Sequence, residues 1–386
     1  MAYFYELFSN LYFLGIVSVC MPLLLCFRMF PVIIFAVRSK NLMDEPGNRS
    51  MHTSKTPTLG GVGLFIAFSL SIAFLGLMAG LSKPDLIKLV SLLAATIMLM
   101  FLGVKDDLFG LAPKKKFMVQ IVASLMVIVL ADLRIISFEG IFGLGELPYY
   151  ISVVFTLFVF LLIINAFNLI DGLDGLAGSV ALLSSLSFGT FFFINERYLF
   201  VLISFVLIGA LLGFLRYNLS PFRKIFMGDS GSMFIGFLLA FQAVGFLSYN
   251  ATIDNPVTNI KAPIMAMAIL SYPLLDTLRV FAIRISQKRS PFSADRNHIH
   301  HRLIDLGITH KQASLFVVIL NGLLIQLAFI IRDLYINVQL YIILVVIPLI
   351  YVSPWLFVRK QGKLKLIKPK PIKWSNIRSR INNFLG

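Results

Sequence analysis

Long apolar segments separated by short polar loops follow one another along most of this chain. A helix that crosses a bilayer needs about 20 consecutive apolar residues. Eleven segments approach that length, at residues 11–37, 59–80, 84–104, 117–133, 149–170, 175–194, 198–215, 231–249, 262–283, 313–331 and 337–358. The pattern predicts an all-α, polytopic integral membrane protein with about eleven transmembrane helices. We expect one transmembrane catalytic domain over 1–358 and a basic tail over 359–386.

The composition excludes an ordinary soluble protein. Apolar residues make up 58% of the chain and charged residues 13%, whereas soluble domains are about 45–50% apolar and about 25% charged. The first apolar segment has neither a basic region before it nor a small-residue cleavage site after it, so we interpret it as retained. The two cysteines, Cys20 and Cys26, both lie in this segment. They form neither a disulfide framework nor a metal-binding pattern.

The net charge of +16 is distributed as expected for a membrane topology rather than for nucleic-acid binding. Eleven spans with the N-terminus outside place one set of loops and the C-terminus in the cytoplasm. These regions lie near 38–58, 105–116, 216–230 and 284–312 and from 359 onward, and they hold 26 of the 34 lysines and arginines. Basic residues concentrate in cytoplasmic loops, so we expect a multi-pass protein of the inner (cytoplasmic) membrane. The tail is also suited to anionic lipids, because each basic residue near the surface adds about 1 kcal/mol of attraction.

Six carboxylates fall at helix ends that this topology brings to the cytoplasmic boundary. They are Asp106 and Asp107 after the third segment, Asp171 and Asp174 after the fifth, Asp229 before the eighth, and Asp276 in the last turns of the ninth. Acidic residues in or beside spanning helices are costly, and they usually mark a functional site. The sequence therefore predicts one polar site to which four separate segments contribute.

The segment NAFNLIDGLDGLAGS, residues 165–179, is predicted to line that site. Asn165, Asn168 and Asp171 stand three residues apart, which places neighbours on one helix face. Over nine residues a regular helix turns through about 900°, so Asp174 would point away from Asn165. Gly172 and the following glycine allow a break in the helix that turns Asp174 back.

Crowded carboxylates need a cation between them, and oxygen ligands without thiolates favour a hard ion. We expect Mg²⁺, with Mn²⁺ as the alternative, held by a carboxylate together with substrate phosphates. The segment MGDSGS opens the eighth span with small residues whose backbone amides are suited to an anion. Lys114, Lys115 and Lys116 and the segment DRNHIHHRL, residues 295–303, add a basic rim. This combination favours a polyphosphate substrate.

Five motifs in this order resemble one enzyme family. They are DEPGNRSMHTSKTPTLGG, GVKDD, NAFNLIDGLDGLAGS, FMGDSGS and DRNHIHHRL. From the first to the last they span about two thirds of the chain, and together they resemble the polyprenyl-phosphate N-acetylhexosamine-1-phosphate transferases. Members of that family pass a sugar-1-phosphate from a UDP-sugar to a membrane-embedded polyprenyl phosphate and release UMP. The resemblance implies undecaprenyl phosphate as the acceptor and a cytoplasmic active site.

The resemblance also implies roles for individual residues. Asp229 would bind Mg²⁺, and Asp106 and Asp107 would be the essential acidic pair. The other roles that it implies are Asn165, Asp171 and Asp174 around the metal and the nucleotide, Phe226 stacked on uracil, Lys116 and Arg302 on the diphosphate, and His52 in the first loop. We count Asp171 and Asp174 among the catalytic residues with Asp106 and Asp107, and we expect Asn168 and Asp276 to bind substrate. The family pattern often has a second basic residue in that loop, where this chain has Ser50. Phe226 is also explained as an ordinary membrane-interface aromatic, and spacing does not rank Lys116 against Lys114 and Lys115.

The segment RNHIHHRL bears on the choice of sugar. His298 and His301 are three residues apart and would share a helix face, whereas His300 would point elsewhere. Because such spacings do not favour convergence, we expect hydrogen bonding to phosphate and sugar, with Arg296 and Arg302, rather than zinc binding. His-Ile-His-His resembles the branch that uses small UDP-N-acetylhexosamines. The expected donor is UDP-GlcNAc, followed by UDP-GalNAc or a deoxy relative, with UDP-MurNAc-pentapeptide last.

The resemblance implies attack of the acceptor phosphate on the β-phosphorus of the donor. We favour direct attack with Asp106 or Asp107 as base, while a covalent intermediate stays open, as does assembly into a homodimer. A cation-coupled transporter is the competing class, because intramembrane acids also mark ion paths. Transporter sites lie near the midplane on broken helices in two repeated halves, whereas these acids share one boundary. A passive scaffold would leave the acids without a role.

Overall fold

The structure is a computed structural model, and it describes residues 7–40, 43–44, 56–252, 260–290, 298–360 and 363–366. His52 and Arg296, two of the predicted site residues, lie outside these ranges. The helices are α2 (Leu11–Ser39), α3 (Gly60–Met78), α4 (Lys83–Phe109), α5 (Pro113–Leu125), a π-helical turn (Met126–Leu130), α6 (Tyr149–Ile170), α7 (Leu176–Ile194), α8 (Tyr198–Asn218), α9 (Gly228–Asn250), α10 (Ala262–Ile269), α11 (Ser271–Ser286), α12 (Ile299–Asp305), α13 (His310–Ile330), α14 (Ile336–Val352) and a 3₁₀ turn (Ser353–Leu356). The strands are β1 (Met43–Asp44), β2 (Thr56–Pro57), β3 (Ser137–Ile141), β4 (Leu144–Glu146), β5 (Phe357–Lys360) and β6 (Lys363–Leu366).

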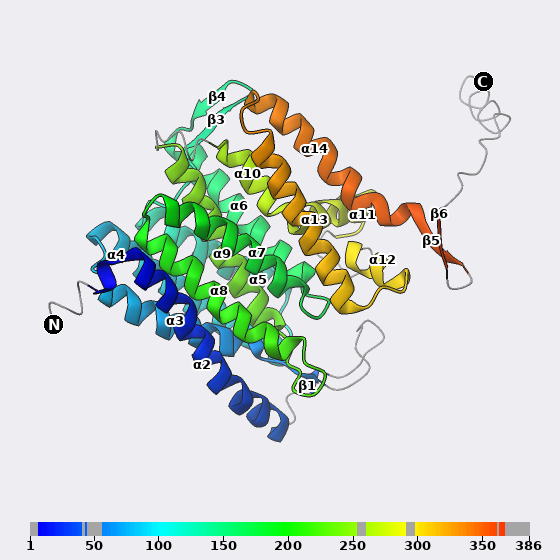
Figure 1. Cartoon of the computed structure of the whole chain (residues 1–386), viewed down its shortest axis with the longest axis horizontal. Helices are drawn as coiled ribbons and strands as arrows, with labels where there is room; N and C mark the ends of the chain where they lie inside the picture. Colours follow the sequence, from blue (N-terminus) through cyan, green and yellow to red (C-terminus); the bar gives the residue numbers. More distant parts are fainter. Residues whose placement is uncertain are drawn as a thin grey trace.

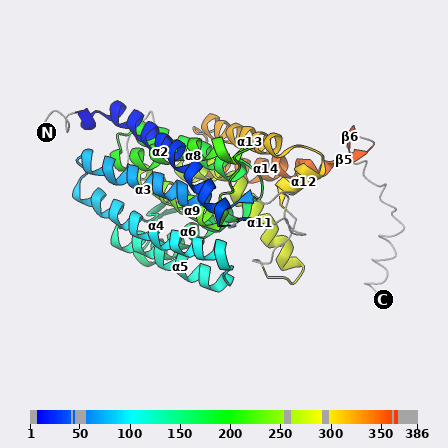
Figure 2. The same cartoon turned by 90° about the horizontal axis from the view of Figure 1, so that it is seen from below.

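The helices form a bundle around α8 and α9 (Figure 1). Of the 18 most apolar consecutive residues of α9, 94% are buried inside the protein, and the share for α8 is 83%. A helix that is apolar on all sides belongs in such a core. By contrast, the buried share of such a stretch is only 22% in α2 and 28% in α14. These two helices therefore present apolar side chains outward. Figure 2 shows α2 at the top of the view, α3 and α4 below it and α5 at the bottom, with α12 to α14 toward the C-terminal side.

The predicted all-α, polytopic membrane fold is confirmed. Within the described residues, nine helices are long and apolar enough to cross a membrane, or ten if the bent pair α10–α11 is one span. The segment expected at 117–133 is instead the 13-residue helix α5 followed by the π-helical turn. Neither element alone is long enough to count as a span, although the two are contiguous and cover most of the predicted segment.

The segment expected as one helix at 262–283 is broken, with a bend of 76° between α10 and α11. Pro273 has no N–H to donate to the Ile269 carbonyl, so the helix loses a bond at this point. The Asn321 side chain of α13 supplies the missing donor, 2.9 Å from the Ile269 carbonyl, and accepts a hydrogen bond from the Ser271 hydroxyl at 2.9 Å. As a result Asp276 lies in the second turn of α11, not in the last turns of a straight span.

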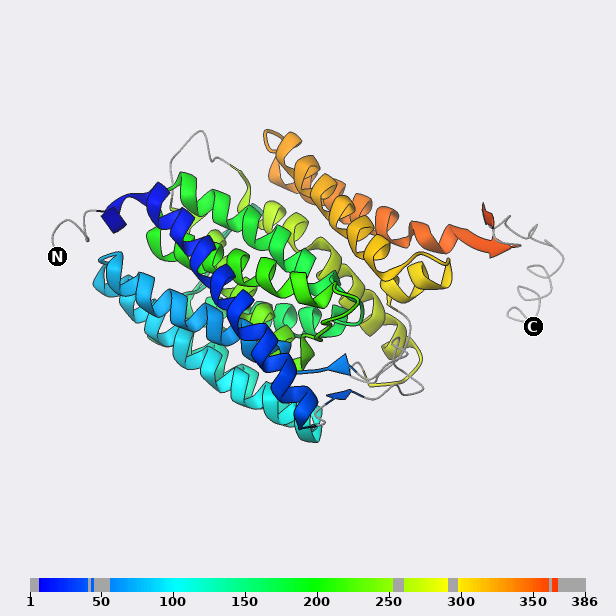
Figure 3. The ribbon, with the colours of Figure 1, turned by 60° about the horizontal axis from the view of Figure 1, so that its bottom comes forward.

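Three two-stranded antiparallel sheets complete the described part of the fold. β3 and β4 lie at one end of the bundle, and β5 and β6 extend from the end of α14 (Figure 1). The predicted boundary between domain and tail at 358/359 falls inside β5. Figure 3 shows α13 and α14 as a separate layer against the main bundle, which holds α2 to α9.

Candidate active site

The predicted layer of acids forms where α4, α5, α6 and α9 meet. Lys116, in the first turn of α5, makes ion pairs with Asp106 of α4 and with Asp229 of α9, the latter at 2.7 Å. Asn168 of α6 donates to the other oxygen of Asp229 at 2.9 Å. One ammonium group between two carboxylates offsets their mutual repulsion. Among the three neighbouring lysines the structure selects Lys116, since Lys114 and Lys115 are exposed.

Asp107 holds the start of α9. Its two carboxylate oxygens accept the backbone N–H groups of Asp229 at 2.7 Å and Ser230 at 3.2 Å. Gly228 before them has φ of +74°, and a Cβ there would lie 2.8 Å from the Asp107 carboxylate. A carboxylate at a helix N-terminus is stabilising. The amides expected to receive a substrate anion are thus bonded to Asp107, and that expectation is corrected.

Close backbone contacts bring α3 and α9 into this position. The amides of Gly60 and Gly61 donate to the carbonyls of Phe226 and Met227, each at 2.9 Å. A Cβ at Gly61 would lie 2.2 Å from the backbone nitrogen of Gly231. Only glycine permits this approach, which explains why the sequence TLGG accompanies FMGDSGS.

Asn165 and Asp171 lie on either side of the Asn168–Asp229 contact. Asn165 is one turn farther into the bundle and donates to Gln120 at 2.9 Å, so it faces a neutral amide and not the acids. Asp171 caps the end of α6 and is half-buried. It makes no hydrogen bond or ion pair within the described part of the chain. Burial, followed by the negative charge of Asp229, raises the pKa of the Asp171 carboxyl well above its usual range.

Asp174 belongs to a second group, on the other side of the loop. It accepts hydrogen bonds from Lys224 at 2.7 Å and from Nδ1 of His310 at 3.1 Å. Burial raises its pKa, but these hydrogen bonds outweigh that effect and leave the Asp174 pKa below its usual value. The Lys224 ammonium also lies 5.0 Å from the centre of the Phe226 ring. Asp174 therefore joins the predicted nucleotide-stacking residue, and not the acids around Lys116.

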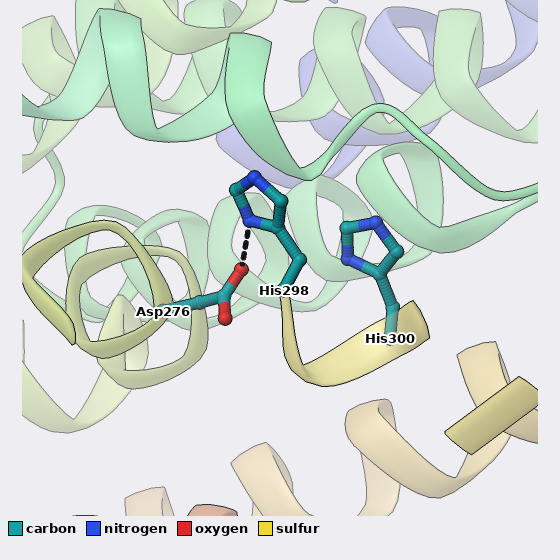
Figure 4. A group of neighbouring side chains, drawn as sticks. All are labelled: Asp276, His298 and His300. Atoms are coloured by element: carbon teal, nitrogen blue, oxygen red, sulfur yellow. Dashed lines mark hydrogen bonds and ion pairs between the residues drawn. The ribbon is translucent and has the colours of Figure 1, made fainter. Parts of the chain in front are cut away.

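Asp276 and the histidine motif form a third group, drawn in Figure 4. Nδ1 of His298 lies 2.7 Å from Asp276, whose other oxygen accepts the Ile299 N–H at 2.9 Å. His298 is the N-cap of α12 and has an extended backbone, so helical spacing does not apply to it. Its ring stacks on that of His300, with centroids 5.2 Å apart, and lies 5.9 Å from that of His301. The predicted proximity of His298 and His301 is therefore found, whereas the expectation that His300 points elsewhere is wrong.

The same geometry corrects the expectation that these ligands do not converge. Asp276, His298 and His300 each offer one atom within 4.8 Å of the others, so they could hold a metal ion. Two of these residues, His298 and Asp276, are already hydrogen-bonded to each other. Nδ1 of His300 lies 3.2 Å from the Tyr272 hydroxyl, so hydrogen bonding gives each of the three residues a partner without a metal.

Arg302, which is predicted to contact the diphosphate, binds backbone carbonyls after α14. Its guanidinium donates to the carbonyls of Pro354 at 3.4 Å and Phe357 at 2.5 Å. It therefore joins α12 to the segment after α14, because a cation is favoured beside the carbonyls at a helix end. His301 stays with the other imidazoles, and its ring centre lies 4.4 Å from that of His300.

The loop from Asp171 to Gly175 connects the three groups. A Cβ on Gly172 would lie 2.8 Å from Nε2 of His300, so α12 packs directly against this loop. Sequence reasoning missed Gln120, Lys224, Tyr272 and His310. Lys224 is two residues before Phe226 and could have been found from the FMGDSGS motif, whereas Tyr272, His310 and Gln120 carry no local signal.

Known proteins resemble the chain over the same region. Residues 89–247 match the model of glycosyl transferase family 4. A decaprenyl-phosphate N-acetylglucosaminephosphotransferase of Mycolicibacterium smegmatis is 32% identical over 295 residues, which cover 72% of each chain. An undecaprenyl-phosphate alpha-N-acetylglucosaminyl 1-phosphate transferase of Salmonella typhi is 32% identical over 73% of this chain and 74% of its own.

A third relative extends the similarity. A probable undecaprenyl-phosphate N-acetylglucosaminyl 1-phosphate transferase of Bacillus subtilis is 29% identical over 86% of this chain and 89% of its own length. The matched family region contains Asp106, Asp107, Lys116, Asn168 and Asp229, which meet in the structure. The chain therefore belongs to glycosyl transferase family 4, among the polyprenyl-phosphate N-acetylglucosamine-1-phosphate transferases.

Proposed function

We propose that this protein transfers N-acetylglucosamine-1-phosphate from UDP-GlcNAc to undecaprenyl phosphate and releases UMP. The observation that carries the proposal is that Lys116 joins Asp106 to Asp229, while Asp107 accepts the backbone N–H of Asp229. Its support is the set of relatives named for polyprenyl-phosphate substrates and N-acetylglucosamine. The acids lie at one end of the bundle, which disfavours a transporter with a midplane site.

A hard divalent cation fits this donor set. Asp229 is 38% exposed at its side chain, and the nearby Asp171 carboxylate has no partner within the described residues. Both cysteines lie in α2, and the ligand atoms that Asp229 and Asp171 offer are carboxylate oxygens. We propose that Asp229, with Asp171 beside it, holds Mg²⁺, with Mn²⁺ as the alternative. When bound, the ion would neutralise charge on the diphosphate.

The contacts suggest different roles for the two adjacent aspartates. Both oxygens of Asp107 accept amides of α9, so it positions Asp229. Asp106 accepts the Leu111 N–H at 2.6 Å through one oxygen and faces Lys116 with the other. We propose that Asp106 is the base for the acceptor phosphate in a direct attack. Lys116 would then contact the diphosphate as it exchanges carboxylate partners for phosphate oxygens.

The second group fits the nucleotide. The half-buried Phe226 ring offers a stacking face for uracil, and Lys224 and Asp174 beside it offer a donor and an acceptor. The histidine group fits the diphosphate and the sugar. A site that hydrogen-bonds acetamido and hydroxyl groups discriminates against donors that lack or block them. We therefore keep the order UDP-GlcNAc, UDP-GalNAc or a deoxy relative, and UDP-MurNAc-pentapeptide.

The test is release of UMP by the purified protein, incubated with undecaprenyl phosphate, Mg²⁺ and each UDP-sugar in turn. We expect the fastest release with UDP-GlcNAc and none after chelation of the metal. Preference for the pentapeptide donor would overturn the choice of sugar. No release with any donor would overturn the proposed reaction.

The proposed location is the inner membrane, with the acids on its cytoplasmic face. The basic tail is proposed to contact anionic lipids, and its residues after Leu366 lie outside the described ones. Assembly into a homodimer stays a prediction.

A further inference from the structure

Two buried imidazoles at the start of α12 are held through the same ring atom by chemically different partners. Nδ1 of His298 lies 2.7 Å from an oxygen of Asp276, whereas Nδ1 of His300 lies 3.2 Å from the hydroxyl of Tyr272. The two rings stack at an angle of 15° (Figure 4). His298 is 5% exposed and His300 is 1% exposed, so neither ring can turn freely to exchange its nitrogens.

The Asp276 contact determines where the proton of His298 resides. Asp276 is tied as an acceptor, because its other oxygen receives the Ile299 N–H at 2.9 Å and the Arg279 guanidinium at 3.3 Å. An ionised carboxylate only accepts hydrogen bonds, so Nδ1 of His298 carries the proton in their shared bond. In the neutral imidazole the lone pair is then on Nε2.

The Tyr272 contact has the opposite consequence for His300. Tyr272 is fully buried, and its hydroxyl makes no hydrogen bond within the described residues other than that with His300. A buried hydroxyl that keeps its proton donates it where an acceptor is in reach, so Nδ1 of His300 accepts. Burial lowers the pKa of His300 to about 3, which keeps the ring neutral near pH 7. Its single N–H is therefore on Nε2.

The two Nε2 atoms are the ones left for a ligand. Neither has a hydrogen-bond partner in the described part of the chain, and neither belongs to the fully enclosed polar atoms without partners. Nε2 of His300 faces Gly172, where a Cβ would lie only 2.8 Å away. Gly172 follows Asp171, so this edge of the imidazole borders the loop that connects the acids with the nucleotide group.

We propose that Tyr272 and Asp276 are positioning residues that fix the two neighbouring imidazoles in opposite tautomers. His300 presents an N–H donor at Nε2, suited to an oxygen of the donor's diphosphate or acetamido group. His298 presents an acceptor at Nε2, suited to a sugar hydroxyl or to the acetamido N–H. The assignment of these ligand groups rests on the proposed function, whereas the tautomers themselves follow from the hydrogen bonds of the chain.

Nitrogen NMR of the full chain, labelled with ¹⁵N in its histidine rings and held in lipid nanodiscs, tests the tautomers directly. Single His298→Gln and His300→Gln variants assign the signals. We expect the proton on Nδ1 in His298 and on Nε2 in His300 at neutral pH. The same tautomer in both rings, or a charged His300, would overturn the inference whether or not the protein releases UMP.

A double-mutant cycle tests whether Tyr272 acts through His300. A glutamine amide can place an N–H donor near the position of Nε2 and has no tautomers, so it does not need Tyr272. We expect Tyr272→Phe to lower kcat by about tenfold or more in the wild-type background, as for loss of a positioned catalytic contact, and less than about twofold in the His300→Gln background.

Tyr351→Phe is the matched control. Tyr351 packs 5.5 Å from the Tyr272 ring, but its hydroxyl contacts Asn321 and Ser271 and no histidine. Its effect should be the same in the wild-type and His300→Gln backgrounds. Equal losses for Tyr272→Phe in both backgrounds would show a merely structural role and overturn the assignment. Absence of UMP release by the wild type would contradict the proposed function alone, because the NMR measurement needs no turnover.

Discussion

At the residue scale, adjacent acids in this site differ because of what their oxygens already accept. Asp107 uses both oxygens for the amides of α9, whereas Asp106 and Asp229 share Lys116. Asp171 and Asp174 are three residues apart, yet burial raises the pKa of one and hydrogen bonds lower that of the other. The pattern DD or DGLD therefore indicates that acids are present, but only the contacts indicate their roles.

Asp229→Asn should remove catalysis without unfolding the protein. The amide keeps the size of the side chain and an acceptor for Asn168, but it loses the negative charge proposed to bind Mg²⁺. A partly exposed side chain contributes little to packing, so we expect the free energy of unfolding to change by less than about 1 kcal/mol. UMP release should fall at least about 100-fold, as for loss of an electrostatic catalytic group. Near-normal, Mg²⁺-dependent turnover in this variant would refute the metal assignment.

Asp107→Asn should show a different combination of effects. Asn has one oxygen in place of two, so one of the Asp229 and Ser230 amides loses its acceptor at the start of α9. Loss of a helix cap costs about 0.5–2 kcal/mol, which should lower the midpoint of thermal unfolding as well as turnover. Asp106→Asn is the control, since no α9 amide bonds to it. If Asp106→Asn lowered the unfolding midpoint more than Asp107→Asn did, the capping role would be wrong.

At the element scale, hydropathy predicted most of the helices but not their interruptions. The runs before Asp107 and Asn168 and after Asp229 are continuous helices in the structure, and the acids at their ends meet as expected. The break between α10 and α11 depends on Asn321, which is about fifty residues away in the sequence. Likewise, His298 was assigned helical spacing because only the fold shows that α12 begins after it. The proline in the first turn of α11 is a local signal of the break, but contacts between distant segments set the bend and the start of α12.

Asn321→Leu tests whether the bend between α10 and α11 positions the active site. The fully buried Asn321 amide donates to Ile269 and accepts from Ser271. The Ile269 carbonyl then keeps the longer bond from Ser184 at 3.3 Å and the Ser271 hydroxyl the contact with Tyr351 at 3.4 Å. Each lost buried hydrogen bond costs about 1 kcal/mol. We expect a lower unfolding midpoint and, because α11 carries Asp276, at least about tenfold slower UMP release from misplacement of reacting groups.

Gln339→Leu is the control for that prediction. Gln339 of α14 is also a buried amide, and it donates to the carbonyls of Arg332 and Leu334 in the loop between α13 and α14, away from α11 and the acids. It should destabilise the protein to a similar extent while the remaining folded fraction keeps its turnover. A similar loss of specific activity in both variants would show that the α10–α11 bend has no special connection to the site.

At the scale of the whole molecule, the count of spans fell from eleven to nine or ten within the described residues, yet the acids still share one end of the bundle. The reason is that α5 and the π-helical turn still run the length of α6. Gln120 of α5 contacts Asn165 near the acids, and the Ile135 N–H after the turn donates to Thr156 toward the other end of α6, at 2.8 Å. Between Asp107 and α6 the chain thus runs from the end of the bundle that holds the acids to the opposite end, and α6 returns it to the acids at Asn168.

This arrangement predicts which end faces the cytoplasm. Basic residues gather on the side of the acids, so the positive-inside tendency places that end inside the cell. In a variant with Cys20 and Cys26 replaced, Lys114→Cys should react with a membrane-impermeant thiol reagent only after the cells are opened. Tyr335→Cys, at an exposed position between α13 and α14, should react in intact cells. Lys114 lies two residues before Lys116, so its labelling reports directly on the catalytic end. Reaction of Lys114→Cys in intact cells would place the acids outside, away from a cytoplasmic UDP-sugar, and would contradict the proposed location even if the purified enzyme were active.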